Sequence, residues 1–383
     1  MKKILIVNNN MHIGGIQKAL LNLLDEIKGK YDVTLLLFCK IGKLSESIPK
    51  EIKVKEPGKR LRILGMTHAE AKADGIFTLI RRSFWTVLTR IFKTRVTFNL
   101  LTRLCRLEEY DCAVSFMQNG DESVFYGGCA ELVLNSVKSE NKVCFIHCDF
   151  LNYGGNNRYN RETLKKFDKV AAVSESVGKK LLKAVPELCD KLCVVHNCVN
   201  YKEIEILKNE YNPDYSDCIN LFTAARLHRE KGILRMIPIF KHIKDKGIDF
   251  VWRIAGDGPE RNEAAAMIKE YGLENEIKLL GNLVNPYPHF YRSDIVLVPS
   301  YDEAAPMVFS EAEAVGTRVF TTDTTSAAEM VGDSGWVCAN SDEEIEKALA
   351  DVLESYTKSK LPITKKDNRT AVEEFEKMIG KKG

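Results

Sequence analysis

IVLVPSYDEAAPMVFSEAEAVG, residues 295–316, is the stretch of this sequence that decides the fold class. Its first four residues are apolar, which predicts a strand covered on both faces, as in a parallel sheet. Glu303 follows in a loop, Pro306 can occupy the first position of a helix, and Glu311 then lies inside that helix. A buried strand, a polar loop and a helix in this order are the repeating unit of a doubly wound α/β fold.

Ten further apolar runs predict strands of the same kind along the chain. Six lie in the first half, at residues 4–7, 33–38, 113–116, 143–146, 170–173 and 192–195. Four lie in the second half, at residues 221–224, 250–255, 277–280 and 318–321. Between the two sets, residues 197–218 contain Asn212-Pro213 and several Tyr, Asp and Asn residues, which is typical of a linker. We therefore predict an N-terminal domain over 1–200 and a C-terminal domain over 201–365, with ligands at the carboxyl ends of the strands.

The composition argues against several classes of protein. The chain has 383 residues, enough for two domains, and its net charge of +3 gives no support for a nucleic-acid partner. No run reaches the roughly 18 apolar residues that a membrane-spanning helix needs. The apolar run near the N-terminus ends at Asn8 without a cleavage site for a secretory signal, so we expect a cytoplasmic protein.

The eleven cysteines are scattered and odd in number, which is typical of reduced thiols that pack as small apolar side chains. Cys189, Cys193, His196 and Cys198 could be imagined as a metal cluster. Their spacing lacks the paired form of structural zinc sites, so we expect no metal and no other cofactor.

Two cations follow the predicted strand 221–224. Arg226 comes two residues after the end of the strand, and Lys231 follows five residues later, before Gly232. Two cations at the carboxyl end of a strand suit a diphosphate, whose charge rises as it becomes a leaving group. The alternative is a pair of solvated surface charges.

Glycine-rich turns follow two other predicted strands. Gly14-Gly15 links the first strand to a helical pattern, and Gly256-Asp-Gly-Pro259 follows strand 250–255. Such turns let the backbone approach a ligand, and the helix start beyond them can bind phosphate or a substrate oxygen. The fingerprints of dinucleotide-binding and ATP-binding loops are incomplete here, and each turn alone is equally typical of plain structure.

The loop and helix after strand 295–298 have the groups needed to bind a nucleotide. The backbone N–H groups around Met307 and Val308 begin a helix and can bind sugar hydroxyls or phosphate. A carboxylate such as Glu311 can accept two hydrogen bonds from a ribose diol. The alternative for Glu311 and Glu313 is a solvated helix face.

Taken in their order along the chain, and spread over nearly its whole length, these four motifs resemble those of the retaining glycosyltransferases of the GT-B fold, in family four (glycosyl transferases group 1). The resemblance implies two Rossmann-like doubly wound domains that face a central cleft. It also implies a C-terminal helix within 366–383 that packs back toward the N-terminal domain.

The resemblance further implies a role for each matching residue. Arg226 and Lys231 match the pair that binds the diphosphate, Glu303 the carboxylate beside the donor sugar, and Glu311 the carboxylate that holds the ribose. Ala304 departs from the glycine that commonly follows the first glutamate, which we expect to narrow the sugar pocket.

Other positions complete the expected site. The expected catalytic residues are Arg226, Lys231, Glu303 and a strand-end histidine, His147. The expected donor-binding residues are Gly15, Gly256, Leu283, Met307, Val308 and Glu311, of which Leu283 contacts the base through its backbone.

The implied reaction moves a hexose, with retention, from a nucleotide-diphospho-sugar to a glycan or a lipid-linked acceptor in cell-surface polysaccharide synthesis. We expect a UDP-sugar first and a GDP-sugar next, and no metal, because two cationic side chains can take its place. Two alternatives remain: a non-catalytic GT-B subunit that binds a partner transferase, and a nucleotide-sugar epimerase of the same fold.

Residues 75–107 contain no acidic side chain and many basic and aromatic ones. The basic residues are Arg81, Arg82, Arg90, Lys93, Arg95, Arg103 and Arg106, and the aromatic ones are Phe77, Phe84, Trp85, Phe92 and Phe98. This pattern is typical of helices that lie on an anionic membrane, so we expect peripheral contact with the inner face of the cell membrane. The alternative is a set of helices packed on the N-terminal sheet with basic outer faces. RNA binding has no supporting motif, and we expect no nucleic acid.

Overall fold

The computed structural model describes residues 1–215, 217–363 and 366–380. The chain forms two compact units, one of Met1–Cys198 with Asn368–Gly383 and one of Val199–Asp367. The sequence places the boundary two residues later, after residue 200. Residue 216 of the predicted linker and residues 364–365 and 381–383 of the predicted domains lie outside the described residues.

The N-terminal unit is built on a seven-stranded sheet in which all neighbouring strands are parallel. The strands are β1 (Lys3–Asn8), β2 (Asp32–Leu37), β3 (Lys53–Lys55), β4 (Cys112–Ser115), β5 (Asn141–Ile146), β6 (Lys169–Ala172) and β7 (Leu192–Val194), in the order β3-β2-β1-β4-β5-β6-β7. Residues 4–7 of β1 are completely buried, because helices cover both faces of the sheet.

The C-terminal unit has a six-stranded parallel sheet. Its strands are β8 (Ile219–Ala224), β9 (Phe250–Ala255), β10 (Ile277–Gly281), β11 (Ile295–Val298), β12 (Arg318–Thr322) and β13 (Gly335–Cys338), in the order β10-β9-β8-β11-β12-β13. Both sheets are doubly wound, as predicted. The strand order reverses between β1 and β4 in the first unit and between β8 and β11 in the second. In such sheets ligands bind where the order reverses, at the carboxyl ends of the strands.

Helices connect the strands in both units. The first unit contains α1 (Gly15–Ile27), α2 (Lys59–Arg62), α3 (His68–Asp74), α4 (Ile76–Thr102), α5 (Cys129–Ser136), α6 (Arg158–Leu164), α7 (Glu175–Ala184) and α15 (Arg369–Ile379). The second contains α8 (Tyr201–Leu207), α9 (Ile233–Asp245), α10 (Arg261–Glu270), α11 (Tyr287–Arg292), α12 (Met307–Ala314), α13 (Ala327–Val331) and α14 (Asp342–Ser355). Short 3-10 turns lie at Lys43–Ser47, Ile63–Gly65, Pro186–Leu188, Arg229–Lys231 and Gly332–Ser334.

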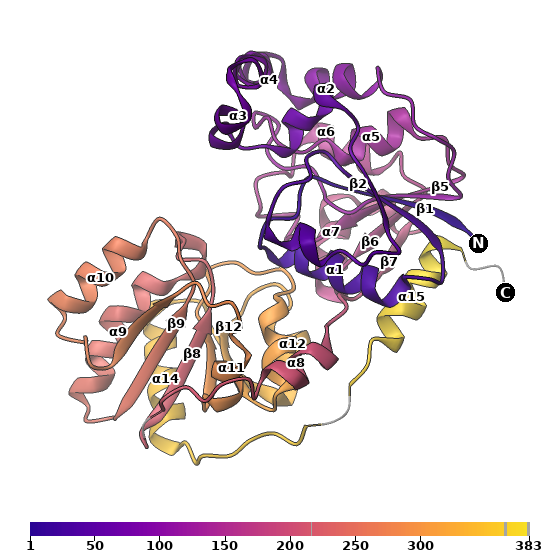
Figure 1. Cartoon of the computed structure of the whole chain (residues 1–383). Helices are drawn as coiled ribbons and strands as arrows, with labels where there is room; N and C mark the ends of the chain where they lie inside the picture. The colour runs from indigo at the N-terminus through magenta and orange to yellow at the C-terminus, as the bar shows by residue number, and fades with distance from the viewer. Residues whose placement is uncertain (216, 364–365, 381–383) are drawn as a thin grey trace. The chain divides into compact units, whose positions relative to one another are not determined.

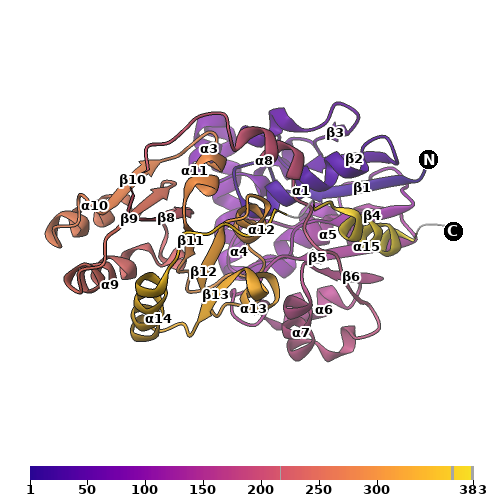
Figure 2. The ribbon, with the colours of Figure 1, turned by 90° about the horizontal axis from the view of Figure 1, so that it is seen from below.

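The two faces of the C-terminal sheet carry different helices. In Figures 1 and 2, α9 and α14 cover one face of the sheet, and α8 and α11 cover the other. The aromatic centre of the first face is Trp252, whose ring lies 4.9 Å from that of Phe240. The Trp252 Nε1–H donates to Thr223 Oγ1 at 2.9 Å, and the Thr223 hydroxyl donates to the carbonyl of Leu297 at 2.6 Å. These two buried hydrogen bonds connect β9, β8 and β11 beneath the point where the strand order reverses.

Helix α15 packs on the N-terminal unit although it ends the chain. Figure 1 shows it in yellow beside α1, with which it is in contact. Lys169 Nζ and Asn141 Nδ2 both donate to the carbonyl of Met378, at 2.8 and 3.1 Å. The Tyr31 hydroxyl donates to Glu376 at 3.0 Å. Two strands and a loop of the first sheet therefore hold the last helix.

The eleven predicted strands are all present, with ends that differ by at most two residues. The prediction missed β3 and β13, each at an edge of its sheet. Both are short, and neither has a fully buried residue: β3 reads Lys-Val-Lys, and the apolar run of β13 is only three residues long, Trp-Val-Cys.

All eleven cysteines carry free thiols. Within the described ranges, no helix combines the length and the apolar character needed to cross a bilayer.

Candidate active site

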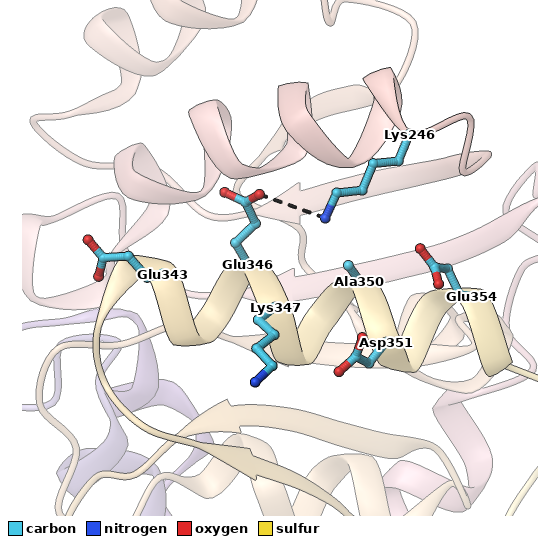
Figure 3. Close-up of a pocket in the computed structure, with 7 residues that line it drawn as sticks. All are labelled: Lys246, Glu343, Glu346, Lys347, Ala350, Asp351 and Glu354. Atoms are coloured by element: carbon cyan, nitrogen blue, oxygen red, sulfur yellow. Dashed lines mark ion pairs between the residues drawn. The ribbon is translucent and has the colours of Figure 1, made fainter.

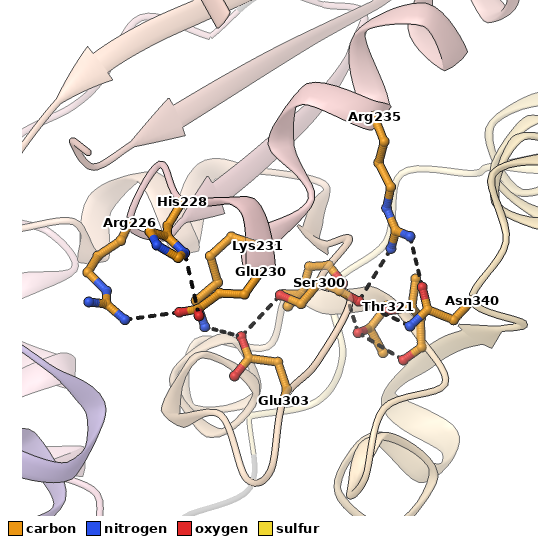
Figure 4. Close-up of polar contacts among 11 residues, drawn as sticks. Arg226, His228, Glu230, Lys231, Arg235, Ser300, Glu303, Thr321 and Asn340 are labelled. Carbon is orange, nitrogen blue, oxygen red and sulfur yellow. Dashed lines mark hydrogen bonds and ion pairs between the residues drawn. The ribbon is translucent and has the colours of Figure 1, made fainter. Parts of the chain in front are cut away.

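The loops after β8 and β11 meet where the C-terminal sheet reverses its strand order. Lys231 Nζ lies 2.6 Å from Glu303 Oε1, and the Ser300 hydroxyl donates to the same oxygen at 3.1 Å (Figure 4). Both charged side chains are mostly buried. The structure therefore brings together two of the predicted catalytic residues, from segments that lie 72 residues apart in the chain.

Arg226 is arranged differently from Lys231. Its side chain is 70% exposed, and its guanidinium pairs with Glu230 Oε1 at 3.0 Å, while the other oxygen of Glu230 lies 3.5 Å from His228 Nδ1. Figure 4 shows this group beside the Lys231–Glu303 pair. An exposed pair of this kind contributes little to stability, so an incoming anion can draw Arg226 away from Glu230 at small cost.

Gly232 allows the two loops to touch. Its backbone is left-handed, with φ of 65°, and a Cβ atom at this position would lie 2.1 Å from the carbonyl oxygen of Pro299. The Tyr301 N–H donates to the carbonyl of Glu230 at 2.8 Å, which fixes the same approach from the other side. Glycine after Lys231 is therefore required by the packing that brings Lys231 to Glu303.

We predict that Gly232→Ala destabilises the C-terminal unit by more than about 2 kcal/mol, because it combines backbone strain with a clash against Pro299. Gly272→Ala is the matched control: Gly272 has nearly the same φ, 63°, and a Cβ atom there would meet no other atom within 4 Å. It should cost only the backbone contribution of about 1 kcal/mol. Urea unfolding of the two variants measures the difference, and equal losses would mean that the Pro299 contact is unimportant.

Arg235 is a residue that the sequence reasoning missed. Its guanidinium is buried, donates to the carbonyl of Pro299 at 2.5 Å and to Asn340 Oδ1 at 2.8 Å, and lies 3.9 Å from the centre of the Tyr301 ring. It therefore holds the loop that carries Glu303 (Figure 4). The sequence offers no clear signal for this role, because a single arginine in a helix normally indicates a solvated position.

The two glutamates of α12 differ in their surroundings. Glu311 is only 4% exposed, and the Tyr287 hydroxyl lies 3.4 Å from its Oε1, so a solvated helix face is the wrong interpretation for it. Glu313 is half-buried and pairs with Lys366. The helix begins at Met307, and Pro306 is its N-cap, with extended backbone (ψ 128°), so the predicted start at Pro306 was one residue early. Met307 and Val308 form the first turn, as expected.

The glycines of the Gly256–Pro259 motif have a packing explanation. Gly256 has φ of 139°, and a Cβ atom there would lie 1.8 Å from the carbonyl oxygen of Ala225. Its N–H donates to the carbonyl of Gly281 at 2.7 Å. The motif therefore lets the β9 loop rest on the start of the β8 loop that carries Arg226. Leu283, half-buried, follows β10, two strands along from β8.

Two predicted residues belong to the N-terminal unit. Gly15 is the first residue of α1, after β1, at the point where this sheet reverses its strand order. His147 directly follows β5, and its ring lies 4.8 Å from that of Phe116 and stacks on Phe145. Its Nε2 is enclosed and has no hydrogen-bond partner among the described residues. Burial lowers the pKa of His147 to about 4, so the imidazole is neutral at physiological pH.

We predict a pH dependence of stability that comes from His147. The unfolded chain binds a proton on this residue below about pH 6.5, whereas the folded chain resists protonation down to about pH 4, so stability falls as the pH falls between these values. The loss should be about 2–3 kcal/mol. Urea unfolding at several pH values should show a shallower slope for His147→Asn than for the wild type. The variant of exposed His68, His68→Asn, should keep the wild-type slope, and an unchanged slope in His147→Asn would contradict the assignment.

A hollow on the C-terminal unit differs in character from the candidate site. It is a shallow pocket of about 320 Å³ on the outer surface of α14, lined by Glu343, Glu346, Lys347, Ala350, Asp351, Glu354 and Lys246 (Figure 3). None of the predicted site residues lines it. Its charged groups pair with one another, as Lys246 does with Glu346 at 3.8 Å, so we interpret it as a solvated helix surface.

Comparison with known proteins agrees with this site. The model of the family "Glycosyl transferases group 1" matches residues 208–369, which include all the predicted residues of the C-terminal unit. Residues 208–369 belong to the glycosyl transferases group 1 family. The resemblance to glycosyl transferases group 1 is therefore confirmed over these residues, which contain three of the four motifs.

Curated relatives of the chain come from distant organisms. The gpi3 subunit of phosphatidylinositol N-acetylglucosaminyltransferase from Schizosaccharomyces pombe is 28% identical over 200 residues, which cover 47% of this chain and 43% of that protein. The capsular polysaccharide biosynthesis glycosyltransferase CapM of Staphylococcus aureus is 23% identical over 198 residues, 48% of this chain and 52% of CapM. The chain thus spans about half or less of the length of these curated relatives.

Solved structures extend the likeness to the unit that precedes the group 1 domain. The structure of Anabaena HepE in complex with UDP matches with a TM-score of 0.63 and 16% identity, over 99% of this chain and 94% of HepE. At this identity the likeness concerns the fold alone. The predicted GT-B fold, with two Rossmann-like domains, is confirmed.

Proposed function

We propose that this protein is a retaining hexosyltransferase that moves a sugar from a nucleotide-diphospho-sugar to a glycan or a lipid-linked acceptor. The observation that carries the proposal is the Lys231–Glu303 pair at the point where the strand order reverses, with the exposed guanidinium of Arg226 on the same loop. This arrangement presents two cations to a dianionic group and one carboxylate to a neighbouring sugar.

The proposed reaction breaks the bond between the anomeric carbon and the diphosphate oxygen. Negative charge grows on that oxygen, and Lys231 and Arg226 stabilise it. The acceptor hydroxyl attacks from the face that the diphosphate leaves, its oxygen bonds to the anomeric carbon, and its proton passes to the departing phosphate oxygen. The configuration is retained without a nucleophile from the protein, and catalysis rests on positioning and charge.

Glu303 orients the cation in this proposal. Its Oε1 binds both Lys231 Nζ and the Ser300 hydroxyl, so Lys231 approaches the diphosphate from a fixed direction. The second carboxylate oxygen of Glu303 can accept from a hydroxyl of the donor sugar. Ala304, the next residue, is buried and narrows the space for that sugar. We propose no metal, because the two cations supply the charge stabilisation, and we expect transfer to persist in EDTA.

The remaining residues of the donor site are assigned in the same proposal. Glu311 holds the ribose, the backbone N–H groups of Met307 and Val308 bind donor oxygens at the start of α12, and the backbone of Leu283 contacts the base. Gly256 positions the β8 loop for the diphosphate. In the N-terminal unit, Gly15 lets the backbone approach the diphosphate, and neutral His147 lies by the donor sugar.

The donor, acceptor and compartment are proposals of the same kind. We favour a UDP-sugar, with a GDP-sugar next, because HepE, a protein of the same fold, is known in complex with UDP. Cell-surface polysaccharide synthesis is supported by the name of the relative CapM. The free thiols of all eleven cysteines suit a reducing compartment, so we place the reaction in the cytoplasm.

A donor screen tests the proposal. Thermal unfolding is measured with UDP, GDP, ADP and their common sugars, and the cognate nucleotide should raise the midpoint by mass action. The stabilising donor is then incubated with the protein, with and without acceptors, and the sugar products are analysed. A changed sugar and free nucleotide without any acceptor would indicate an epimerase. Nucleotide binding with no turnover would favour a non-catalytic subunit. No nucleotide binding at all would exclude the transferase.

A further inference from the structure

Helix α4 of the N-terminal unit has its apolar face outward and its polar face inward, the reverse of what is usual for a helix on a water-exposed surface. Its outward face carries six large apolar side chains, which we call the apolar stripe: Ile76, Phe77, Ile80, Phe84, Val87 and Ile91. Phe77 is 81% exposed, and each of the other five is more than half exposed. From Phe77 onward they recur every three or four residues, so they form one continuous line along the helix.

The opposite face of the same helix is polar and points into the unit. Arg82 is buried, donates to the carbonyl of Ile63 at 2.7 Å, and lies 5.5 Å from the centre of the Phe125 ring. Thr89 is buried and shares a hydrogen bond with Thr97 at 2.8 Å. A rotation of α4 that buried the stripe would break these contacts. The outward orientation of the stripe is therefore fixed by the polar face.

The end of α4 continues the same surface after a break. Lys93 has φ of 64°, which interrupts the helix, and the Thr94 N–H donates to the carbonyl of Glu122 at 2.8 Å. Beyond the break, three further exposed apolar side chains follow: Val96, Leu100 and Leu104. Figure 1 shows α3 and α4 at the margin of the N-terminal unit.

A pocket of about 540 Å³ opens between the two parts of α4 and helix α2. It is lined by Lys59, Arg60 and Arg81 together with Trp85, Leu100, Leu101 and Leu104. The three cations can bind a phosphate group, and the apolar and aromatic side chains can contact an alkyl chain attached to that phosphate. Four further cations of residues 75–107 are exposed: Arg90, Arg95, Arg103 and Arg106.

We propose that the apolar stripe and this pocket form a docking surface for an anionic lipid bilayer, with lipid phosphates held by Lys59, Arg60 and Arg81. Charge decides between the occupants that could cover the stripe. Residues 75–107 contain no acidic side chain, so a second copy of this face would bring like charges together, whereas anionic lipid complements it. The proposal rests on these contacts and is independent of the proposed transferase activity.

Vesicle binding by the full chain tests this surface. Sedimentation with vesicles of phosphatidylcholine is compared with sedimentation with vesicles that also contain phosphatidylglycerol, and binding is expected to need the anionic lipid. Phe77→Ser/Phe84→Ser should weaken binding at least about a hundred-fold, since each phenylalanine contributes about ten-fold or more when it enters the acyl region. Both side chains are exposed, so thermal unfolding should stay unchanged. Ile206→Ser, at an equally exposed apolar residue of α8 (74%), should bind like the wild type.

The cations and the pocket are tested separately. Arg81→Glu/Arg90→Glu should abolish the preference for phosphatidylglycerol, and Trp85 emission should shift to shorter wavelength on binding, a shift that Trp85→Phe removes. Free inorganic phosphate should not reproduce that shift. Equal binding of the serine variant and the wild type would overturn the proposal. Wild-type binding to vesicles that contain only phosphatidylcholine would also overturn it. The proposal would also be overturned if the wild type bound neither kind of vesicle and formed a dimer, and the serine variant were monomeric. That result would indicate that a second copy of the chain covers the stripe.

Discussion

Lys231→Ala is expected to lower kcat/KM for sugar transfer by about a thousand-fold, which corresponds to about 4 kcal/mol of lost transition-state stabilisation. Lys231 is mostly buried, and its Nζ is fixed 2.6 Å from Glu303, so it is oriented before the donor arrives. A cation held in this way stabilises a departing diphosphate more than a mobile surface charge does, because little reorganisation is needed during the reaction.

Steady-state kinetics with the donor found by the screen measures this effect. Lys241→Ala is the matched control, because it removes one lysine from an exposed ion pair with Asp245 toward the far end of α9. It should change kcat/KM less than about two-fold. The Lys231 variant leaves Glu303 without its cation and should lose about 1–3 kcal/mol of stability. Its activity is therefore assayed at a temperature well below its unfolding midpoint. Transfer by Lys231→Ala within ten-fold of the wild type would remove Lys231 from the catalytic assignment.

Glu311→Gln is expected to weaken donor binding by about ten- to a hundred-fold, with a smaller effect on kcat. An ionised carboxylate offers about four acceptor positions, so one carboxylate can accept from several hydroxyl groups at once, including the two of a ribose diol. Hydrogen bonds to a charged group contribute about 1.5–3 kcal/mol each, and the amide of glutamine keeps a neutral acceptor only. Calorimetric titration with the nucleoside diphosphate measures the change in Kd.

A 2′-deoxy nucleotide sharpens this second prediction. The wild type should bind it more weakly than the ribonucleotide, whereas Glu311→Gln should distinguish the two much less, because the interaction that differs is already lost. Glu313→Gln is the control, since Glu313 lies two residues further along the same helix and pairs with Lys366. If both glutamine variants lose the same affinity, the effect is one of helix charge and the ribose assignment is wrong.

The interior strands and the order of the motifs could be read from the sequence because their signals are local. A strand buried on both faces, such as β11, needs apolar residues at every position, and that requirement is visible without a structure. The edge strands β3 and β13 were not predicted because they are short and only partly shielded, so each has at most three consecutive apolar residues.

The candidate site was predictable as a set of residues but not as a set of contacts. Arg226, Lys231 and Glu303 follow strand ends, and the sequence places all three at one edge of a sheet. That Lys231 pairs with Glu303 while Arg226 pairs with Glu230 depends on how the two loops pack around Gly232. Arg235 supports this packing from inside, and its burial has no local signature.

Composition predicted the basic and aromatic character of residues 75–107, and left open whether these residues pack inward or face out. The structure decided the orientation: Arg82 and Thr89 point into the unit, and Phe77 and Phe84 point away from it. Hydrogen bonds to Ile63 and Thr97 fix this choice, and the partners lie on other turns and elements that no pattern within α4 reveals.

The sequence by itself determined the doubly wound fold class, the approximate division into two units and the residue types of the candidate site, because each depends on the order of strands, loops and glycines along the chain. Only the tertiary structure decided which charges pair, that Glu311 is buried while Glu313 is not, and which face of α4 is outward. These depend on contacts between segments far apart in the chain, and the free energy of such contacts is set by burial and hydrogen-bond geometry in the folded protein.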